Sequence, residues 1–399
     1  MNKYTIRDLD VKSKKVLVRV DFNVPRKDGI ITDDNRIKCA LDTINYLLDN
    51  NARVILFSHL GKVNHKDKDK TLSDIKKNDM AIVGDYLKLL YKDRFTYVGV
   101  TRGLELERAI DSLNDGELLL MQNTRYEVGE SKNDDELSQY WASLADLYVS
   151  DAFGSVHRAH ASTVGVAKIL PNALGFLVEK EVIALSNAID NPKRPLVAIL
   201  GGAKVSDKIA VIDNLLKIAD KVIIGGGMAY TFIKAKGFNI GDSLLEVDKI
   251  SLASQYLNNY DCNKLVLPID CVIADDFDNP KDIKSVDIDK IPDGFMGLDI
   301  GDKTISLFKD HLKGAKTVIW NGPMGVFERS EFAKGTIEIC KAISELDGVL
   351  SVIGGGDSAS AAINFGYQDK ISHISTGGGA SLEYMEGKVL PGIDIIRDK

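Results

Sequence analysis

Two lysines follow a buried apolar run in the stretch P-L-V-A-I-L-G-G-A-K-V-S-D-K, which covers Pro195–Lys208. The run Leu196–Leu200 predicts a parallel strand buried on both faces, and the glycine pair after it permits a tight turn. Helical spacing follows, and either residue of the Ser-Asp pair could cap that helix, so Lys204 would lie just before its N-terminus and Lys208 in its first turn. Ammonium groups beside exposed amide N–H groups suit an anion, although solvated lysines at a plain strand-to-helix turn explain this stretch equally well.

A second group of candidate residues lies in the first half of the chain, where basic and hydrogen-bonding side chains follow short apolar runs. They are Asp21, Asn23 and Arg36 after the first run, His59 and Lys62 after the second, Arg125 after the fourth and Arg158 after the fifth. Each alone has a structural explanation, as a turn residue, a buried histidine or half of an ion pair. So many cations at one sheet edge would repel one another unless an anion neutralised them, and arginine is suited to bidentate phosphate or carboxylate recognition. The pattern therefore predicts a small polyanionic substrate.

Glycines replace these charged residues at the strand ends of the second half. The clusters are Gly201-Gly202, Gly225-Gly226-Gly227, Gly354-Gly355-Gly356 and Gly377-Gly378-Gly379, with Asn321-Gly322-Pro323 after another run. Glycine lets main-chain N–H groups approach a ligand closely, so its repetition along one rim predicts a ligand with several phosphates, and a nucleotide fits best. No G-x-x-x-x-G-K-[ST] occurs, so this is not a P-loop.

Asp357 in G-G-G-D-S-A-S-A stands where a helix should begin. An N-cap is the simpler explanation of an aspartate there. The alternative is that Asp357 holds Mg²⁺ against nucleotide phosphates, because this hard ion prefers carboxylate and phosphate oxygens.

Two sheets are needed to position these residues. In the first half, short β-rich runs separated by helical periodicity occur at Val16–Val20, Val54–Phe57, Phe95–Val98, Leu118–Met121 and Leu147–Ser150. The second half has runs at Leu196–Leu200, Val222–Ile224, Leu265–Ile269, Thr317–Trp320, Val349–Ile353 and His373–Ser375. This alternation predicts a parallel α/β sheet in each half, with ligands beyond the carboxyl ends of the strands.

A helix between the halves is the candidate connector. Pro171 precedes a segment whose predicted helix covers Ala173–Ile189, and its apolar residues fall on more than one face, as expected for a helix packed between two lobes. Connections of this kind commonly permit relative motion. Residues 62–79, by contrast, alternate Lys with Asp and predict a solvated loop.

Composition bounds the class of protein. A chain of 399 residues is too long for one ordinary core, and 44% hydrophobic with 27% charged residues is typical of a soluble globular protein. No run of ~18 apolar residues appears and the N-terminus lacks a signal-peptide core, so we expect a cytoplasmic protein with no membrane partner. A net charge of −7 argues against general nucleic-acid binding. The four cysteines have no metal-ligand spacing and are expected to be reduced, buried thiols.

Ten runs resemble the phosphoglycerate kinase family, in order and at about that family's spacing. They are V-L-V-R-V-D-F-N-V-P, S-H-L-G, H-R-A-H, G-F-L-V-E-K-E, L-G-G-A-K-V-S-D-K-I, I-I-G-G-G-M-A-Y-T-F, F-M-G-L-D-I-G, W-N-G-P-M-G-V-F-E, G-G-G-D-S-A and I-S-T-G-G-G-A-S-L-E-Y-M-E-G-K-V-L-P-G. The resemblance implies an α/β fold of two Rossmann-like lobes, each a parallel sheet covered by helices. It implies that residues 1–171 bind 3-phosphoglycerate, 172–190 form the connecting helix, 191–388 bind Mg-ATP or Mg-ADP, and 389–399 pack back on the first lobe.

The resemblance also implies roles for individual residues. Asp21, Asn23, Arg36, His59, Arg125 and Arg158 match substrate-binding positions, and Lys204 and Lys208 match lysines at the transferring phosphoryl group and the nucleotide phosphates. Glu328 matches the ribose-binding glutamate, Gly355, Gly356, Asp357 and Ser358 match the phosphate and Mg²⁺ loop, and Gly297, Asn321 and Pro323 match parts of the nucleotide pocket. Three departures stand out: Lys62-Val63 replaces the usual Arg-Pro, Gln122 replaces a glutamate, and Ser358 takes a position that is Thr or Ser in the family.

The implied reaction is reversible, Mg²⁺-dependent phosphoryl transfer between 1,3-bisphosphoglycerate with ADP and 3-phosphoglycerate with ATP, as in glycolysis and gluconeogenesis. Arg36, Lys204, Mg²⁺ and the N–H groups near Gly356 and Gly378 would surround the transferred group, and no side-chain nucleophile is needed. We expect a monomer. An NAD-dependent dehydrogenase would want a G-x-G-x-x-G fingerprint that this chain lacks, and a non-catalytic nucleotide-binding regulator would be expected to lose a phosphate ligand, although Arg36, Lys204, Lys208 and Asp357 are all present.

Overall fold

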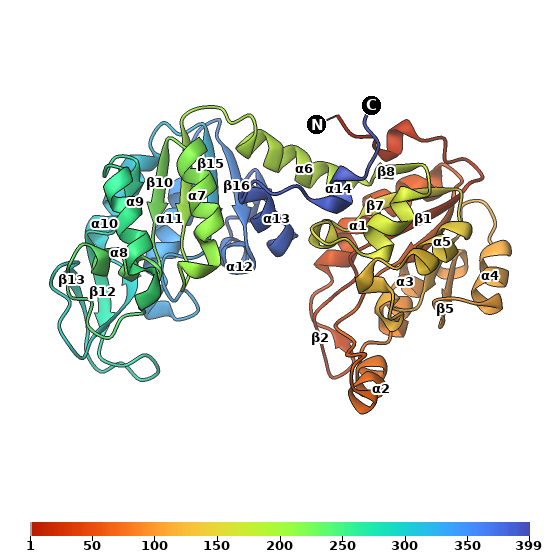
Figure 1. The fold of residues 1–399 in the computed structure, drawn as a ribbon, viewed down its shortest axis with the longest axis horizontal. Coiled ribbons are helices and arrows are strands. Elements are labelled where there is room, and N and C mark those ends of the chain that lie inside the picture. Colours follow the sequence, from red (N-terminus) through yellow and green to blue (C-terminus); the bar gives the residue numbers. More distant parts are fainter. Residues whose placement is uncertain (1) are drawn as a thin grey trace. The chain divides into compact units, whose positions relative to one another are not determined.

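The computed structural model describes residues 2–399 and divides the chain into two compact units (Figure 1). Unit 1 contains the residues up to Ile183 together with Val389–Lys399, and unit 2 is the continuous segment Ala184–Lys388.

Unit 1 is built on a six-stranded parallel sheet of order β5-β6-β4-β1-β7-β8. Its strands are β1 (Lys15–Val20), β4 (Arg53–Phe57), β5 (Phe95–Val98), β6 (Leu118–Met121), β7 (Leu147–Asp151) and β8 (Asn172–Leu174), and a hairpin of β2 (Arg26–Lys27) and β3 (Ile30–Ile31) lies outside it. The parallel sheet predicted from the five apolar runs is confirmed. The sixth strand, β8, was assigned by sequence to the connecting helix, and that assignment is wrong for Ala173 and Leu174.

Helices cover both faces of this sheet. The helices of this unit include α1 (Asn35–Asp49), α2 (Lys68–Lys77), α3 (Ala81–Tyr91), α4 (Leu104–Asp111), α5 (Asp135–Ser143) and α14 (Pro391–Asp394). On one face Ile44 of α1 and Val83 of α3 share a core with Val18. On the other face Phe57 meets Trp141 of α5 with ring centroids 5.8 Å apart. Because both faces are buried, the strands are apolar throughout.

Helix α2 lies where the sequence predicted a solvated loop, so that prediction is wrong for Lys68–Lys77. The helix begins at a side-chain cap, since Asp67 Oδ1 accepts from the Lys70 N–H at 3.0 Å. None of its residues is buried. Helix formation here rests on the cap and on lysines in the last turn, not on an apolar stripe.

Helix α6 (Phe176–Ile189) starts after β8, three residues later than the sequence predicted. Its N-terminus is satisfied by Asp151, whose Oδ1 accepts from the Leu177 N–H at 2.9 Å and the Val178 N–H at 3.3 Å. The boundary between the units falls within this helix, after Ile183.

Unit 2 has a second six-stranded parallel sheet, of order β11-β10-β9-β15-β16-β17. Its strands are β9 (Leu196–Leu200), β10 (Lys221–Ile224), β11 (Leu265–Val266), β15 (Thr317–Asn321), β16 (Leu350–Gly354) and β17 (His373–Ile374). The sequence predicted β11 to reach Ile269, but Pro268 has no N–H to give to a ladder and the strand ends before it.

A small antiparallel sheet of order β13-β12-β14, which the sequence did not predict, is formed by β12 (Asp270–Ala274), β13 (Ile283–Asp287) and β14 (Met296–Ile300). The helices of unit 2 are α7 (Ile209–Ile218), α8 (Ala229–Ala235), α9 (Ile250–Asn259), α10 (Asp302–Leu312), α11 (Lys334–Ser344), α12 (Gly356–Asn364) and α13 (Gly378–Met385). Phe308 of α10 and Ile339 of α11 pack with Trp320 in the main core.

The C-terminal segment completes unit 1. The Tyr4 N–H donates to the Arg397 carbonyl at 2.8 Å, and the Gly392 N–H donates to the Val156 carbonyl at 2.8 Å. Lys3 Nζ lies 3.1 Å from Asp398 Oδ1. The two ends of the chain are therefore joined within one unit.

Within residues 2–399, no helix combines the length and apolar character that a membrane span requires. All four cysteines are free thiols. Cys271 and Cys340 are buried as expected, but Cys262 is exposed and Cys39 is half-buried, so the prediction of four buried thiols is wrong.

Candidate functional site

The carboxyl ends of β1 and β4 are tied together in unit 1. Arg36 Nη1 donates to Asp21 Oδ2 at 2.9 Å, and Asn23 Oδ1 accepts from the Gly61 N–H at 2.8 Å. Asp21 is buried while Arg36 is half-buried, so the aspartate orients a guanidinium that still reaches the surface of the rim. These contacts give Asp21 and Asn23 a structural role besides any contact with a ligand.

His59 lies beneath this rim and contacts Arg19, a residue that the sequence analysis did not select. Arg19 Nη2 and His59 Nδ1 are 3.0 Å apart, and both side chains are buried. Burial, and then the charges of Arg19, Arg125, Arg36 and Arg158, hold the pKa of His59 well below its ordinary value. Arg19 is the one charged residue in the apolar run Val16–Val20. A charged residue within a strand that is buried on both faces was the signal that could have identified it.

Arg125 and Arg158 complete the cationic rim. The Arg125 guanidinium donates to the Gly61 carbonyl, and burial followed by the charges of Arg19 and Arg158 lowers the pKa of Arg125 to about 10. Arg158 is exposed, and its Nε donates to His157 Nε2 at 3.0 Å. The same cations and burial lower the pKa of His160 to about 4. The rim thus gathers positive charge that a bound anion would relieve.

Lys62 differs from the other rim residues because its side chain is exposed. Its carbonyl accepts from Asn78 Nδ2 at 2.7 Å, so the backbone there is held while the side chain faces solvent. Gln122 is buried and its Oε1 accepts from the Met80 N–H at 2.8 Å, which gives this residue a structural use.

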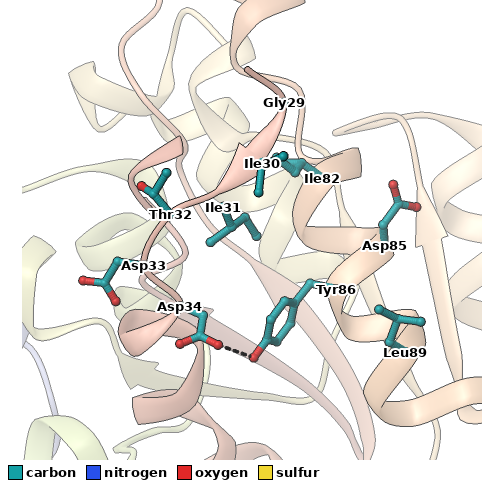
Figure 2. Close-up of a pocket in the computed structure, with 10 residues that line it drawn as sticks. All are labelled: Gly29, Ile30, Ile31, Thr32, Asp33, Asp34, Ile82, Asp85, Tyr86 and Leu89. Atoms are coloured by element: carbon teal, nitrogen blue, oxygen red, sulfur yellow. Dashed lines mark hydrogen bonds between the residues drawn. The ribbon is translucent and has the colours of Figure 1, made fainter. Parts of the chain in front are cut away.

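A separate pocket of ≈ 610 Å³ in unit 1 lies between the β2–β3 hairpin and α3 (Figure 2). Asp33, Asp34 and Asp85 line it together with apolar side chains, and Tyr86 donates its hydroxyl to Asp34 Oδ2 at 2.9 Å. Carboxylates repel phosphate, so this pocket is not the predicted anion site.

In unit 2, the segment after β9 places Lys204 before the helix, as predicted, but places Lys208 differently from the prediction. A 3₁₀ turn spans Ser206–Lys208 and α7 begins at Ile209, so Lys208 precedes the helix instead of lying in its first turn. Ser206 is not a cap; its hydroxyl and N–H both donate to Glu246. Lys208 Nζ donates to Asn321 Oδ1, and burial lowers the pKa of Lys208 to about 8. Lys204 is exposed.

Asp357 is the second residue of α12 and is exposed. Gly355, with φ of 89°, occupies the N-cap position, so the N-cap explanation of Asp357 is wrong. Ser358 is fully buried, and its Oγ accepts from the Gly322 N–H at 2.6 Å. Asp357 is thus the side chain of this loop that faces solvent, while Ser358 holds the neighbouring loop.

The glycine clusters have two different uses. A Cβ added to Gly201 would lie 2.1 Å from the Pro323 carbonyl oxygen, and one added to Gly322 would lie 2.2 Å from the Gly201 carbonyl oxygen. These glycines are needed because three loops pack backbone against backbone. A Cβ on Gly356 would meet nothing within 4 Å among the described residues, and one on Gly378 would approach the Gly356 nitrogen at 3.8 Å. Gly356 and Gly378 therefore leave open space at the rim.

A pocket of ≈ 770 Å³ in unit 2 has a largely apolar lining that includes Leu244, Phe277 and Met296. Four of the predicted nucleotide residues line it: Gly297, Pro323, Glu328 and Asp357. A Cβ on Gly297 would lie 1.8 Å from the Tyr230 hydroxyl, so glycine is required there by packing. Lys204, Lys208, Asn321, Gly355, Gly356, Ser358 and Gly378 are not among its lining residues.

The sequence analysis did not select Asp299, and it named Asn321 without indicating its buried amide donor. Asp299 lines the pocket, and burial raises its pKa to about 7, although its carboxylate accepts from the Gly335 N–H at 2.7 Å. Asn321 Nδ2 is buried and has no hydrogen-bond acceptor within the described part of the chain. Asn321 thus offers a donor to a ligand beside the Lys208 ammonium.

Comparison with known proteins gives one consistent result. The family model described as phosphoglycerate kinase matches residues 6–388. Phosphoglycerate kinases of Fusobacterium nucleatum and Listeria monocytogenes are 57% and 58% identical to this chain, over the whole of both chains in each case. The solved phosphoglycerate kinase structures from Coxiella burnetii and Pyrococcus horikoshii match with TM-scores of 0.89 and 0.83 at 37% and 32% identity, each covering 98% of both chains.

Proposed function

The chain belongs to the phosphoglycerate kinase family, whose members transfer a phosphoryl group between ATP and the carboxyl group of 3-phosphoglycerate, and we propose how its two units divide that reaction. Unit 1 binds the phosphoglycerate and unit 2 binds the nucleotide. The difference in charge between the two units carries this proposal. Arginines gather around His59 in unit 1. Unit 2 has an apolar pocket, with Lys208 and solvent-facing glycines near it.

In unit 1, Arg36, Arg125 and Arg158 neutralise the 3-phosphate and the carboxylate of the acceptor. His59 offers a hydrogen bond from below, and Asp21 and Asn23 hold the rim in place and contact the acceptor's hydroxyl side. Lys62 supplies the outermost charge. The lowered pKa values of Arg125 and His59 support this assignment, because clustered cations gain most from an anion.

In unit 2, the apolar pocket takes the base, with Gly297 and Pro323 in its lining, and Glu328 takes the ribose hydroxyls. Lys208, Asn321 and the N–H groups of Gly355 and Gly356 contact the nucleotide phosphates. Gly356 and Gly378 are the first residues of α12 and α13, and because they have no side chain the phosphates can approach the N–H groups of these helix N-termini.

The residues present suit Mg²⁺ bound together with the nucleotide. No group of three or more carboxylate, histidine or cysteine side chains among residues 2–399 could hold a metal alone. Mg²⁺ commonly takes one or two carboxylates with substrate phosphates and water, and exposed Asp357 at the pocket edge supplies such a carboxylate. When bound, the ion screens negative charge between the phosphates.

The transfer itself needs no protein nucleophile. A terminal oxygen of the ADP β-phosphate attacks the phosphorus of the acyl phosphate, the bond between that phosphorus and the carboxyl oxygen breaks, and ATP and a carboxylate result. Lys204 and Arg36 meet the charge on the phosphoryl group as it moves, with the N–H groups of Gly356 and Gly378. Reacting atoms must come within about 3–3.5 Å, so catalysis requires both ligands to be bound at once.

A coupled assay of ADP release from ATP tests the proposal. We expect turnover that requires 3-phosphoglycerate and Mg²⁺. ATP turnover that is the same with and without 3-phosphoglycerate would contradict it. We also propose that the protein acts in the cytoplasm as a monomer, because one chain carries both sets of site residues; light scattering of the purified protein would show a dimer if this is wrong.

A further inference from the structure

We propose that Glu130 and Ser162 are positioning residues of the unit 1 rim: they fix the guanidinium of Arg19, and Arg19 holds His59 as a neutral imidazole with its proton on Nε2. The inference rests on the proposed function for its consequence, which is that His59 presents an N–H donor to the phosphoglycerate anion. The hydrogen-bond chain that supports it lies wholly within unit 1.

The proton on His59 follows from its partner. Arg19 Nη2 lies 3.0 Å from His59 Nδ1. Guanidinium nitrogens carry only donors, so Nδ1 must accept and cannot carry a hydrogen. The single proton of the neutral ring is then on Nε2. Protonating Nδ1 as well would turn an N–H toward a cation, which agrees with the low pKa of His59.

Arg19 is held at its other nitrogens. Its Nε donates to Ser162 Oγ at 2.8 Å, and its Nη1 donates to the Val20 carbonyl at 2.5 Å. The Ser162 hydroxyl has one proton, and its other close partner is Glu130 Oε1 at 2.6 Å. Glu130 Oε2 accepts from the Ser162 N–H at 3.0 Å. Arg19 therefore donates in two directions, to His59 on one side and to Ser162 on the other, and the Ser162 hydroxyl donates in turn to Glu130.

Burial gives this series its effect. Arg19 and Glu130 are each 1% exposed and Ser162 is 0% exposed. A buried cation and a buried carboxylate are costly unless each is compensated, and here a single hydroxyl joins them. The three residues come from β1, from the 3₁₀ turn Glu130–Lys132 and from the π turn Ala161–Gly165. Removing the hydroxyl would release the Arg19 guanidinium and the tautomer it enforces.

The direct test is ¹⁵N NMR of the histidine rings in the ligand-free protein at neutral pH, with His59 assigned by its loss in His59→Gln. We expect Nδ1 of His59 at the position of an unprotonated nitrogen and Nε2 at that of a protonated one. In Ser162→Ala we expect both tautomers. A proton on Nδ1 in the unaltered protein overturns the proposal, whether or not the protein has kinase activity.

Kinetics separates positioning from structural support. Ser162→Ala should raise KM for 3-phosphoglycerate about tenfold with little change in KM for ATP, because a contact in unit 1 is lost. Ser155→Ala is the matched control, since that buried hydroxyl lies 3.5 Å from Arg19 Nη2 and should matter less. Equal rises for both substrates, or a larger rise for Ser155→Ala, overturn the positioning role.

Glu130→Gln covers the case in which Ser162→Ala fails to fold. It keeps the shape of the side chain and one acceptor, so its melting temperature should fall less, while the mixed His59 tautomers should remain. A single Nε2–H tautomer of His59 in every variant that folds, including Glu130→Gln alone, would show that Glu130 and Ser162 do not position Arg19. If the unaltered protein lacks 3-phosphoglycerate-dependent turnover, the proposed function fails while the NMR result still decides the tautomer.

Discussion

The two units have the same six-stranded parallel architecture but differ in what stands at the strand ends. The rim of unit 1 is made of charged side chains, with Arg36, Arg125 and Arg158 near a buried histidine. The rim of unit 2 is made of main chain, glycines and an apolar pocket. A small, highly charged ligand can be recognised only through charge and hydrogen bonds. A nucleotide also offers a flat apolar base, and it can be recognised by burial.

The difference extends to the electrostatics. In unit 1, burial lowers the pKa of Arg125 to about 10, and the neighbouring cations Arg19 and Arg158 add to the shift. In unit 2, burial likewise lowers the pKa of Lys208, to about 8, but the nearby carboxylates of Asp207 and Asp357 oppose the shift. The charges around Arg125 are thus mainly of its own sign, whereas those around Lys208 are of the opposite sign.

Lys204→Ala should break the comparison most strongly. The substitution removes a cation from the rim of unit 2, which has few charged side chains. Loss of one hydrogen-bond donor to the transition state typically lowers kcat about 10²–10³-fold. Nucleotide affinity should change little. Steady-state kinetics and ADP titration check this, with Lys217→Ala in the same segment as control, because Lys217 is exposed in the last turn of α7. A variant keeping more than half of the kcat would remove Lys204 from catalysis.

Asp357→Asn should raise the Mg²⁺ concentration needed for half-maximal activity by about tenfold or more, because one carboxylate ligand is lost. The melting temperature should stay near that of the unaltered protein, since Gly355 and not Asp357 occupies the N-cap. Removing Mg²⁺ with a chelator should abolish turnover in both proteins. An unchanged Mg²⁺ titration with a lower melting temperature would assign Asp357 to helix stability instead.

Gly201→Ala and Gly356→Ala distinguish the unit 2 glycines that are needed for packing from those that leave space for a ligand. The new methyl group at Gly201 would collide with the Pro323 carbonyl, and such overpacking typically costs about 1–3 kcal/mol of unfolding free energy. At Gly356 there is space, so stability should be kept while ADP binding weakens. Denaturant unfolding and ADP titration of both variants measure this. Equal loss of stability in the two would show that both glycines serve packing.

Lys208 should make nucleotide binding depend on pH. Its pKa of about 8 means that the free protein loses this charge as the pH rises through about 8, and bound phosphates would raise that pKa, so ADP affinity should fall several-fold. Lys208→Arg should remove this dependence, because guanidinium stays charged. The folded protein holds the Lys208 proton less tightly than the unfolded chain does. The contribution of Lys208 to the free energy of unfolding therefore increases as the pH rises above about 8. An ADP affinity that is flat across this range would contradict the prediction.

Lys62→Arg should have the smallest effect. Lysine lacks the bidentate geometry of arginine, so the substitution should lower KM for 3-phosphoglycerate by a few-fold. Lys66→Arg, an exposed lysine nearby, serves as control. If KM for 3-phosphoglycerate is unchanged or higher, the helix α2 that follows has altered how this edge meets the acceptor.

The sequence predicted the two parallel sheets because each central strand is an apolar run between helical segments. It failed where local pattern carries little information. Strand β8 is three residues long and continues into α6, so its apolar residues were assigned to the helix. Helix α2 buries nothing and has no apolar stripe. The antiparallel sheet of β12, β13 and β14 is held by pairing across the chain, which residue spacing does not reveal.

The rim residues were found because chemistry and position agree, as with Arg36 and His59 after strand ends. Arg19 was missed because it lies within a strand, and its burial depends on Ser162, which is distant in sequence. The sequence analysis assigned the glycines one use, the close approach of main-chain N–H groups to a ligand, and coordinates were needed to see that Gly201 and Gly322 pack against each other. The roles assigned to these side chains remain predictions for the experiments above.

The joining of the chain ends in unit 1 has a consequence for synthesis on the ribosome. Unit 2 is one continuous segment, so all of its strands and helices have emerged once Lys388 has left the exit tunnel. Most of unit 1 is made before unit 2, yet the carbonyl of Arg397 that pairs with Tyr4 is made only after unit 2. The nascent chain must therefore carry an unfinished first unit, with its edge near β8 uncovered, throughout production of the second. Early termination near residue 388 would harm the unit that was translated first.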